Sequence, residues 1–67
     1  MISITLNGDA RRVTAGITIA GLAAELGLNP LKIAVERNLA IVPRSTLADV
    51  LLVDGDQLEI VHFVGGG

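Results

Sequence analysis

Residues 18–30, TIAGLAAELGLNP, decide the fold of this chain because they carry its amphipathic helix pattern. Thr18 is a residue type that caps helix N-termini, since its hydroxyl can accept a backbone N–H of the first turn. Gly27 suits the left-handed residue that ends a helix, and Pro30 prevents the helix from resuming. The apolar residues follow the spacing i, i+3, i+4, i+7, which gives one buried stripe: Ile19, Leu22, Ala23 and Leu26.

A β-hairpin is predicted before this helix. Residues 2–6 alternate apolar and polar side chains, which is the pattern of a half-buried strand. Asn7-Gly8 follows, and both residue types tolerate the positive φ angles of a tight hairpin turn. Residues 10–14 then return as a second, antiparallel strand.

Further strands are predicted after the helix. Residues 33–36 form a third strand, Asn38 marks a turn, and residues 40–42 form a short fourth strand that ends at Pro43. A proline there suits the edge of a sheet, because it cannot donate a ladder hydrogen bond. We expect a short helical turn over residues 45–50, with Ser45 as its cap. Residues 54–56, Asp-Gly-Asp, form a turn before a long last strand over residues 57–64.

This order of elements predicts an α+β fold. The helix must cover one face of the sheet, because its apolar stripe would otherwise stay in water. The simplest solution is a β-grasp, a mixed four- to five-stranded sheet packed on one main helix. A chain of 67 residues allows one domain, which we place at residues 1–64, followed by a flexible glycine tail at residues 65–67.

The composition excludes several classes of function. The net charge is −2, which disfavours binding to nucleic acid, where Lys and Arg neutralise phosphates. The absence of cysteine excludes disulfides, thiolate metal sites and thiol catalysis. The chain has one His and no Tyr or Trp, which leaves few side chains for an active site of its own. We therefore do not expect an enzyme, and we expect no bound cofactor and no metal site. Neither a signal peptide nor a membrane span is visible, so we expect a cytoplasmic protein.

The end of the chain is its most informative part. The last strand leads directly into Gly65, Gly66 and Gly67. Glycines without Cβ atoms can thread a narrow slot in another protein and deliver a terminal carboxylate there. A frayed end is the alternative interpretation, since many chains end in small flexible residues.

The last strand also predicts a docking surface. We place Leu58, Ile60 and Val64 toward the helix, which leaves Val61 and Phe63 as exposed apolar residues beside the tail. Arg44, next to a predicted sheet edge, is the best arginine for a contact with a partner. His62 as a base or metal ligand is disfavoured, because a lone His near a strand end is usually structural or solvated.

Three segments together resemble the ThiS family of sulfur carrier proteins. They are residues 4–8 (ITLNG), residues 33–44 (IAVERNLAIVPR) and residues 54–67 (DGDQLEIVHFVGGG). Any one of them is weak evidence, but in this order and spacing they are specific. Two positions depart from the family: Leu47 stands where many relatives carry an aromatic residue, and Leu39 where a Gly often follows the Asn.

The resemblance implies a ubiquitin-like β-grasp fold, a defined chemical cycle and no catalysis by this chain itself. An adenylating enzyme of the ThiF type would use ATP to activate the Gly67 carboxylate. A sulfur donor such as a cysteine desulfurase would convert it to a thiocarboxylate, and a thiazole synthase of the ThiG type would take the sulfur for thiamine biosynthesis. Gly66 and Gly67 match the family's terminal pair, and Gly65 matches a less constrained position. Two alternatives stay open: a sulfur carrier for molybdopterin synthesis, and a β-grasp binding module without terminal chemistry.

Overall fold

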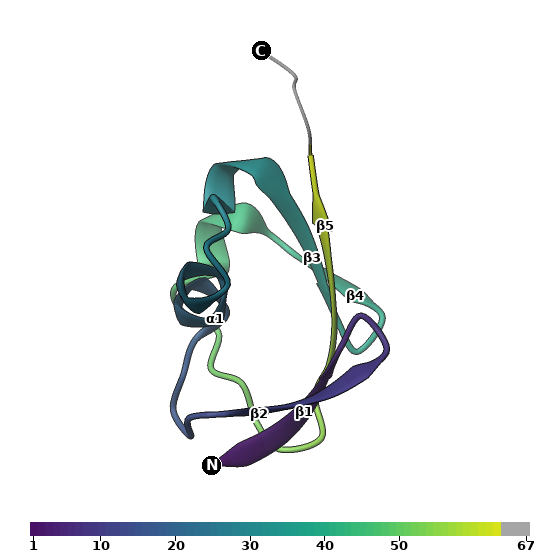
Figure 1. The fold of residues 1–67 in the computed structure, drawn as a ribbon. Helices are drawn as coiled ribbons and strands as arrows, with labels where there is room; N and C mark the ends of the chain where they lie inside the picture. Colours follow the sequence, from purple (N-terminus) through teal and green to yellow (C-terminus); the bar gives the residue numbers. More distant parts are fainter. Residues whose placement is uncertain (64–67) are drawn as a thin grey trace.

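A computed structural model describes residues 1–63 of the chain. In these residues the chain forms five strands, one α-helix and two single-turn 3₁₀ helices, which Figure 1 shows in order. Their bounds are β1 Ile2–Leu6, β2 Asp9–Val13, α1 Ile19–Glu25, η1 Pro30–Lys32, β3 Ile33–Arg37, β4 Ala40–Val42, η2 Arg44–Thr46 and β5 Gln57–His62.

The five strands form one mixed sheet in the order β2-β1-β5-β3-β4. The sheet is antiparallel except where β5 pairs in parallel with β1, through Thr5 opposite Gln57 and Leu6 opposite Leu58. On its other side β5 pairs antiparallel with β3, from Ile33 opposite His62 to Arg37 opposite Leu58. The last strand therefore lies at the centre of the sheet, and the short β4 forms one edge, as the proline after it predicts.

The helix covers one face of the sheet and closes the core. Figure 1 shows α1 and both 3₁₀ turns on the same side of the sheet, with no helix on the opposite face. The Thr18 hydroxyl accepts the Gly21 N–H at 3.0 Å, and Gly27 takes a φ of 73° just beyond the helix, as predicted for both ends. The buried core consists of Ile4, Val13, Ile19, Leu22, Ala23, Ile33, Val35, Leu47, Leu52, Leu58 and Ile60. The predicted two-layer β-grasp architecture is confirmed.

Two tight turns use positive φ angles. Asn7 and Gly8, at φ 49° and 86°, join β1 to β2, as their sequence predicts. Asn38 and Leu39, at φ 51° and 71°, join β3 to β4. Leu39 thus holds a conformation that an L-residue with a Cβ adopts at a cost, and its side chain is 89% exposed, so packing does not compensate for it.

Some predicted boundaries were wrong. The second strand begins at Asp9 and ends at Val13, because it pairs with β1 directly from the two-residue turn. The helical turn predicted over residues 45–50 is a 3₁₀ turn over Arg44–Thr46, followed by hydrogen-bonded turns. Ser45 does not cap it; the proline before the turn occupies the cap position without a side-chain bond. The described part of the last strand ends at His62, and Val64 lies outside the described residues.

Candidate functional site

The candidate site lies at the end of β5, and two neighbouring strands hold this strand in place. Its pairing with β3 extends to His62, and Phe63 N–H still donates to the Lys32 carbonyl at 2.7 Å. On the opposite side β1 holds its first residues. The sheet therefore fixes the direction of the chain as far as Phe63. Gly65, Gly66 and Gly67 themselves lie outside the described residues.

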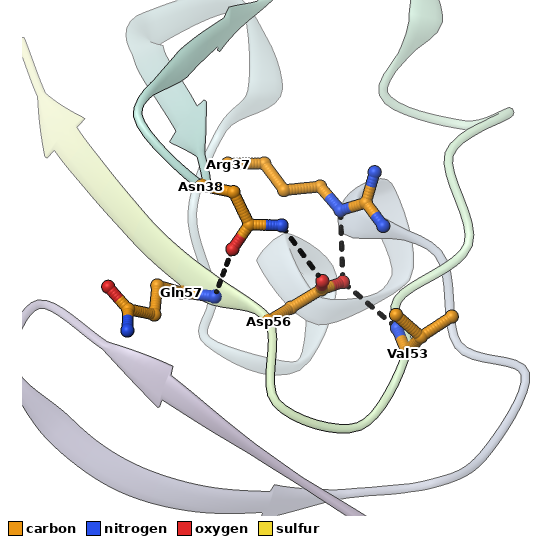
Figure 2. Close-up of polar contacts among 5 residues, drawn as sticks. All are labelled: Arg37, Asn38, Val53, Asp56 and Gln57. Atoms are coloured by element: carbon orange, nitrogen blue, oxygen red, sulfur yellow. Dashed lines mark hydrogen bonds and ion pairs between the residues drawn. The ribbon is translucent and has the colours of Figure 1, made fainter.

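A buried carboxylate fixes the start of β5. Asp56 is only 3% exposed, and Figure 2 shows it receiving donors from three sides. Its Oδ2 accepts Arg37 Nε and the Val53 N–H, both at 2.9 Å, and its Oδ1 accepts Asn38 Nδ2 at 3.1 Å. The Asn38 side chain in turn accepts the Gln57 N–H at 2.9 Å. These bonds join the end of β3, the β3–β4 turn and the start of β5 into one unit.

The charge of Asp56 is stabilised in spite of its burial. Burial by itself would raise the pKa of this carboxyl. The Val53 N–H, the Arg37 and Asn38 side chains, and the positive charge of Arg37 outweigh burial and lower the pKa below its usual value. Asp56 is therefore an ionised structural anchor at neutral pH.

The Asn7 side chain extends the hold on β5 where β1 has ended. Its Oδ1 accepts the Ile60 N–H at 2.8 Å, and its Nδ2 donates to the Ile60 carbonyl at 3.2 Å. A single side-chain amide thus supplies the donor and the acceptor that one further residue of a neighbouring strand would supply.

The two faces of β5 separate as predicted. Leu58 and Ile60 are buried toward the helix, whereas Val61 and Phe63 are 59% and 47% exposed. Val61 lies opposite Ala34 of β3 on the face without a helix, which extends the apolar area across two strands. Glu59, two residues before Val61, lies opposite Glu36. The open face at this end thus combines apolar side chains with a pair of carboxylates.

Arg44 lies exposed near the same end of the sheet. One of its guanidinium nitrogens donates to the Ile33 carbonyl at 3.4 Å, and Ile33 pairs with His62. The structure therefore brings Arg44 to the part of β3 that faces the end of β5. It also lines a surface hollow with Pro43 and Ile41.

No cluster of metal-binding side chains is found among residues 1–63. In that part of the chain, no three His, Cys, Asp or Glu side chains are placed to hold a metal ion. No described helix is long and apolar enough to cross a membrane. Another hollow is lined by Thr5, Glu36, Leu39, Glu59 and neighbouring residues.

Two structural residues were missed by reasoning from sequence. Asp56 was recognised as a turn residue, and Asn7 as a hairpin residue, but their side-chain roles were not predicted. Asp56 meets Arg37 across 19 positions, and Asn7 meets Ile60 across 53. No local sequence pattern predicts such distant pairs.

The chain resembles known proteins in both sequence and fold. The model of the ThiS family matches residues 4–67, nearly the whole chain and all of its glycine tail. The chain belongs to the ThiS family. A crystal structure of the thiamine biosynthesis protein ThiS from Geobacter metallireducens superposes with a TM-score of 0.83 at 26% identity, covering 98% of this chain and 100% of that one. The β-grasp assignment and the family thus agree.

Two kinds of curated relative share this ThiS-family sequence. The sulfur carrier protein ThiS of Bacillus subtilis is 46% identical over 50 residues, which cover 75% of this chain and 76% of that protein. A thiazole synthase of Paramagnetospirillum magneticum is 50% identical over 66 residues, which cover 98% of this chain. The chain spans only 20% of the length of that synthase. A segment similar to this chain is therefore found within a longer protein of that name.

Proposed function

We propose that this ThiS-family chain is a sulfur carrier whose Gly67 carboxylate is the group that carries the sulfur. The observation that carries the proposal is the family match, which extends from β1 through the three glycines. The fold supports it, because β5 leads directly toward the tail and is fixed by both neighbouring strands and by Asp56. The chain acts as a protein co-substrate, and its partner enzymes perform the catalysis.

The chemistry follows from the properties of a carboxylate. An ionised carboxylate resists nucleophiles, and at neutral pH a terminal carboxyl is ionised because its pKa is about 3.5. A ThiF-type enzyme would join it to the α-phosphate of ATP with loss of pyrophosphate, which creates a mixed anhydride with AMP as the leaving group. A persulfide of a cysteine desulfurase would then displace AMP, and a thiol would reduce the resulting acyl disulfide to the thiocarboxylate.

We propose a thiazole synthase of the ThiG type as the acceptor of the sulfur. Support comes from the relative named thiazole synthase, which is 50% identical to this chain over 66 residues. A carrier segment and an acceptor enzyme in one polypeptide would serve the same transfer. With this acceptor, the chain would serve thiamine biosynthesis rather than molybdopterin synthesis.

We propose the open face at the end of β5 as the docking surface for these enzymes. Val61 and Phe63 would supply apolar contact area beside the tail, and Arg44 a charged contact at its margin. Gly65 and Gly66 would pass through a narrow channel of each enzyme, where a side chain would not fit.

The deciding experiment is the intact mass of the protein after incubation with ATP, a ThiF-type enzyme, a cysteine desulfurase, cysteine and a thiol reductant. We expect a mass gain that matches replacement of one oxygen by sulfur, and no gain in a variant that lacks Gly67. Adding a thiazole synthase with its small substrates should return the original mass. If the chain stays unchanged while the same enzymes modify another carrier, the proposal is wrong and a binding module without terminal chemistry is left.

A further inference from the structure

The main-chain groups of β5 alternate between its two neighbours. Toward β3, the Phe63 N–H donates to the Lys32 carbonyl and the Gln57 carbonyl accepts the Asn38 N–H. In the antiparallel β3–β5 register, the odd-numbered residues of β5 therefore form the hydrogen bonds to β3. The even-numbered residues point to the other side. There the Asp56 carbonyl accepts Thr5 N–H, and the Leu58 carbonyl accepts Asn7 N–H, both at 2.9 Å.

Ile60 and His62 are the next residues of this even-numbered series. Ile60 is satisfied by the side chain of Asn7, which replaces a strand neighbour. His62 has no such substitute, because β1 has ended at Leu6 and the chain turns away at Gly8. Figure 1 shows β5 continuing past the β1–β2 turn. His62 lies opposite Ile33 at an even-numbered position, so its N–H and carbonyl point away from β3. Within residues 1–63, the pairing with β1 ends at Leu58 and the Asn7 side chain bonds only to Ile60, so neither reaches His62, which is exposed.

We propose that this short open edge at His62 receives an extended segment of the partner enzyme that processes the tail, as one additional strand. The groups on offer are one main-chain donor and one acceptor, and the groups that match them in spacing and direction are those of another extended backbone. The inference rests on the proposed function, since it assigns part of the contact to a tail-processing enzyme.

The neighbouring side chains define the chemistry of that segment. Val61 and Phe63 flank His62 on the open face of the sheet, and both are exposed and apolar. Side chains of adjacent strands on one face lie close enough to pack. The segment therefore places an apolar side chain on this face, beside Val61, while its backbone pairs with His62.

Amide hydrogen exchange tests the pairing without altering the chain. We expect the His62 amide to exchange rapidly in the free carrier and to become protected in the complex with the ThiF-type enzyme or with the thiazole synthase. The amides of Ile60 and Val61 serve as internal references, because the first is bonded to Asn7 and the second lies on the β3 side. A His62 amide that stays unprotected in both complexes overturns the inference.

A pair of variants separates backbone from side chain. His62→Pro removes the open N–H without removing a bond to β3, whereas His62→Ala keeps the N–H and removes only the imidazole. Loss of one hydrogen bond corresponds to about a three- to tenfold change in Kd. We expect His62→Pro to weaken binding of the enzyme by at least that factor and His62→Ala to bind like the wild type. Equal binding of both variants overturns the inference, and the exchange experiment decides it if His62→Pro does not fold.

The same experiments distinguish this inference from the proposed function. If the unaltered carrier gains sulfur and its His62 amide stays open in both complexes, the function stands and the added strand is wrong. If the carrier gains no sulfur, the function itself fails. Protection of His62 that rises with carrier concentration in the absence of an enzyme would assign the edge to a second copy of the chain and overturn the inference.

Discussion

Arg37 Nε donates to Asp56 Oδ2 at 2.9 Å, yet the two side chains differ in exposure. Asp56 is 3% exposed, whereas Arg37 is 31% exposed. The carboxylate is therefore the buried member of the pair, and the arginine reaches it from the surface. Because Asp56 immediately precedes β5, this contact fixes where the tail-bearing strand begins. Asp56 anchors one end of β5 and the proposed docking surface lies at the other end, so stability and docking should depend on different residues.

Asp56→Asn should destabilise the fold strongly. The amide would turn an NH₂ group toward donors that now meet a carboxylate, and it would remove the charge that balances Arg37. We expect the free energy of unfolding to fall by about 2–4 kcal/mol. Urea unfolding at neutral pH measures it. Asp54→Asn is the matched control, since Asp54 accepts one exposed bond from Ser3 N–H, and its loss should stay near 1 kcal/mol. Equal losses would contradict the anchor role.

Stability should fall in acid because of the same carboxylate. The pKa of Asp56 is lowered in the folded protein, so its contribution is complete above the usual Asp pKa of about 3.9 and is lost as the pH falls from there through the lowered value. Urea midpoints between neutral pH and pH about 2 should show this decline, and Asp56→Asn should flatten it. An unchanged slope in the variant would assign acid unfolding to other groups.

Leu39→Gly should stabilise the protein. Leu39 has a φ of 71° and is 89% exposed, so the substitution removes backbone strain and little packing. The relief of about 1–2 kcal/mol is partly offset by the greater freedom of glycine in the unfolded chain, which leaves a gain of about 0.5–1 kcal/mol. Leu31→Gly, at a 71% exposed position that is not among those with positive φ, should instead destabilise. A thermal or urea midpoint for Leu39→Gly below the wild type would refute the strain argument.

Glu36 and Glu59 should repel each other across the sheet. They lie directly opposite on β3 and β5, where like charges destabilise. Glu59→Gln and Glu36→Gln should each raise the free energy of unfolding by about 0.2–1 kcal/mol at low salt. Since either change removes the same repulsion, the double variant should gain less than the sum of the two. Gains in stability that add fully, or that stay the same in high salt where charge repulsion is screened, would point to another cause.

Val61→Asp should weaken docking without unfolding the carrier. Its side chain is exposed on the open face, so stability should change by no more than about 0.5 kcal/mol. A charge in an apolar contact should raise the Kd for the ThiF-type enzyme or the thiazole synthase by about tenfold or more. Leu51→Asp is the control, because Leu51 is similarly exposed but pairs with Thr18, before the helix. Binding of Val61→Asp at the level of this control would remove Val61 from the docking surface.

Much of the local structure was predictable because it depends on neighbouring residues. The helix with its Thr18 cap and Gly27 end follows from spacing and capping chemistry, and so does the hairpin turn at Asn7-Gly8. Alternation along residues 57–63 correctly separated buried Leu58 and Ile60 from exposed Val61 and Phe63. The order of the predicted elements indicated the β-grasp, and the family likeness, carried by three separate segments, implied the same fold.

Boundaries and the short 3₁₀ turn were less predictable. The start of β2 depends on its register with β1, and the turn after β4 is formed by Pro43 and Arg44 rather than by a Ser45 cap. Both depend on pairing and turn geometry that a single segment does not reveal.

The sequence by itself determined the helix, the faces of the strands, and the glycines after β5, because each depends on the chemistry of residues a few positions apart. Only the tertiary structure decided that β5 is central, that Arg37 and Asn38 converge on Asp56, and that Asn7 satisfies Ile60 but leaves His62 open. These relationships join residues 18 to 53 positions apart. Buried polar groups need hydrogen-bond partners in the folded chain, and these partners lie too far apart in the sequence for a local pattern to predict them.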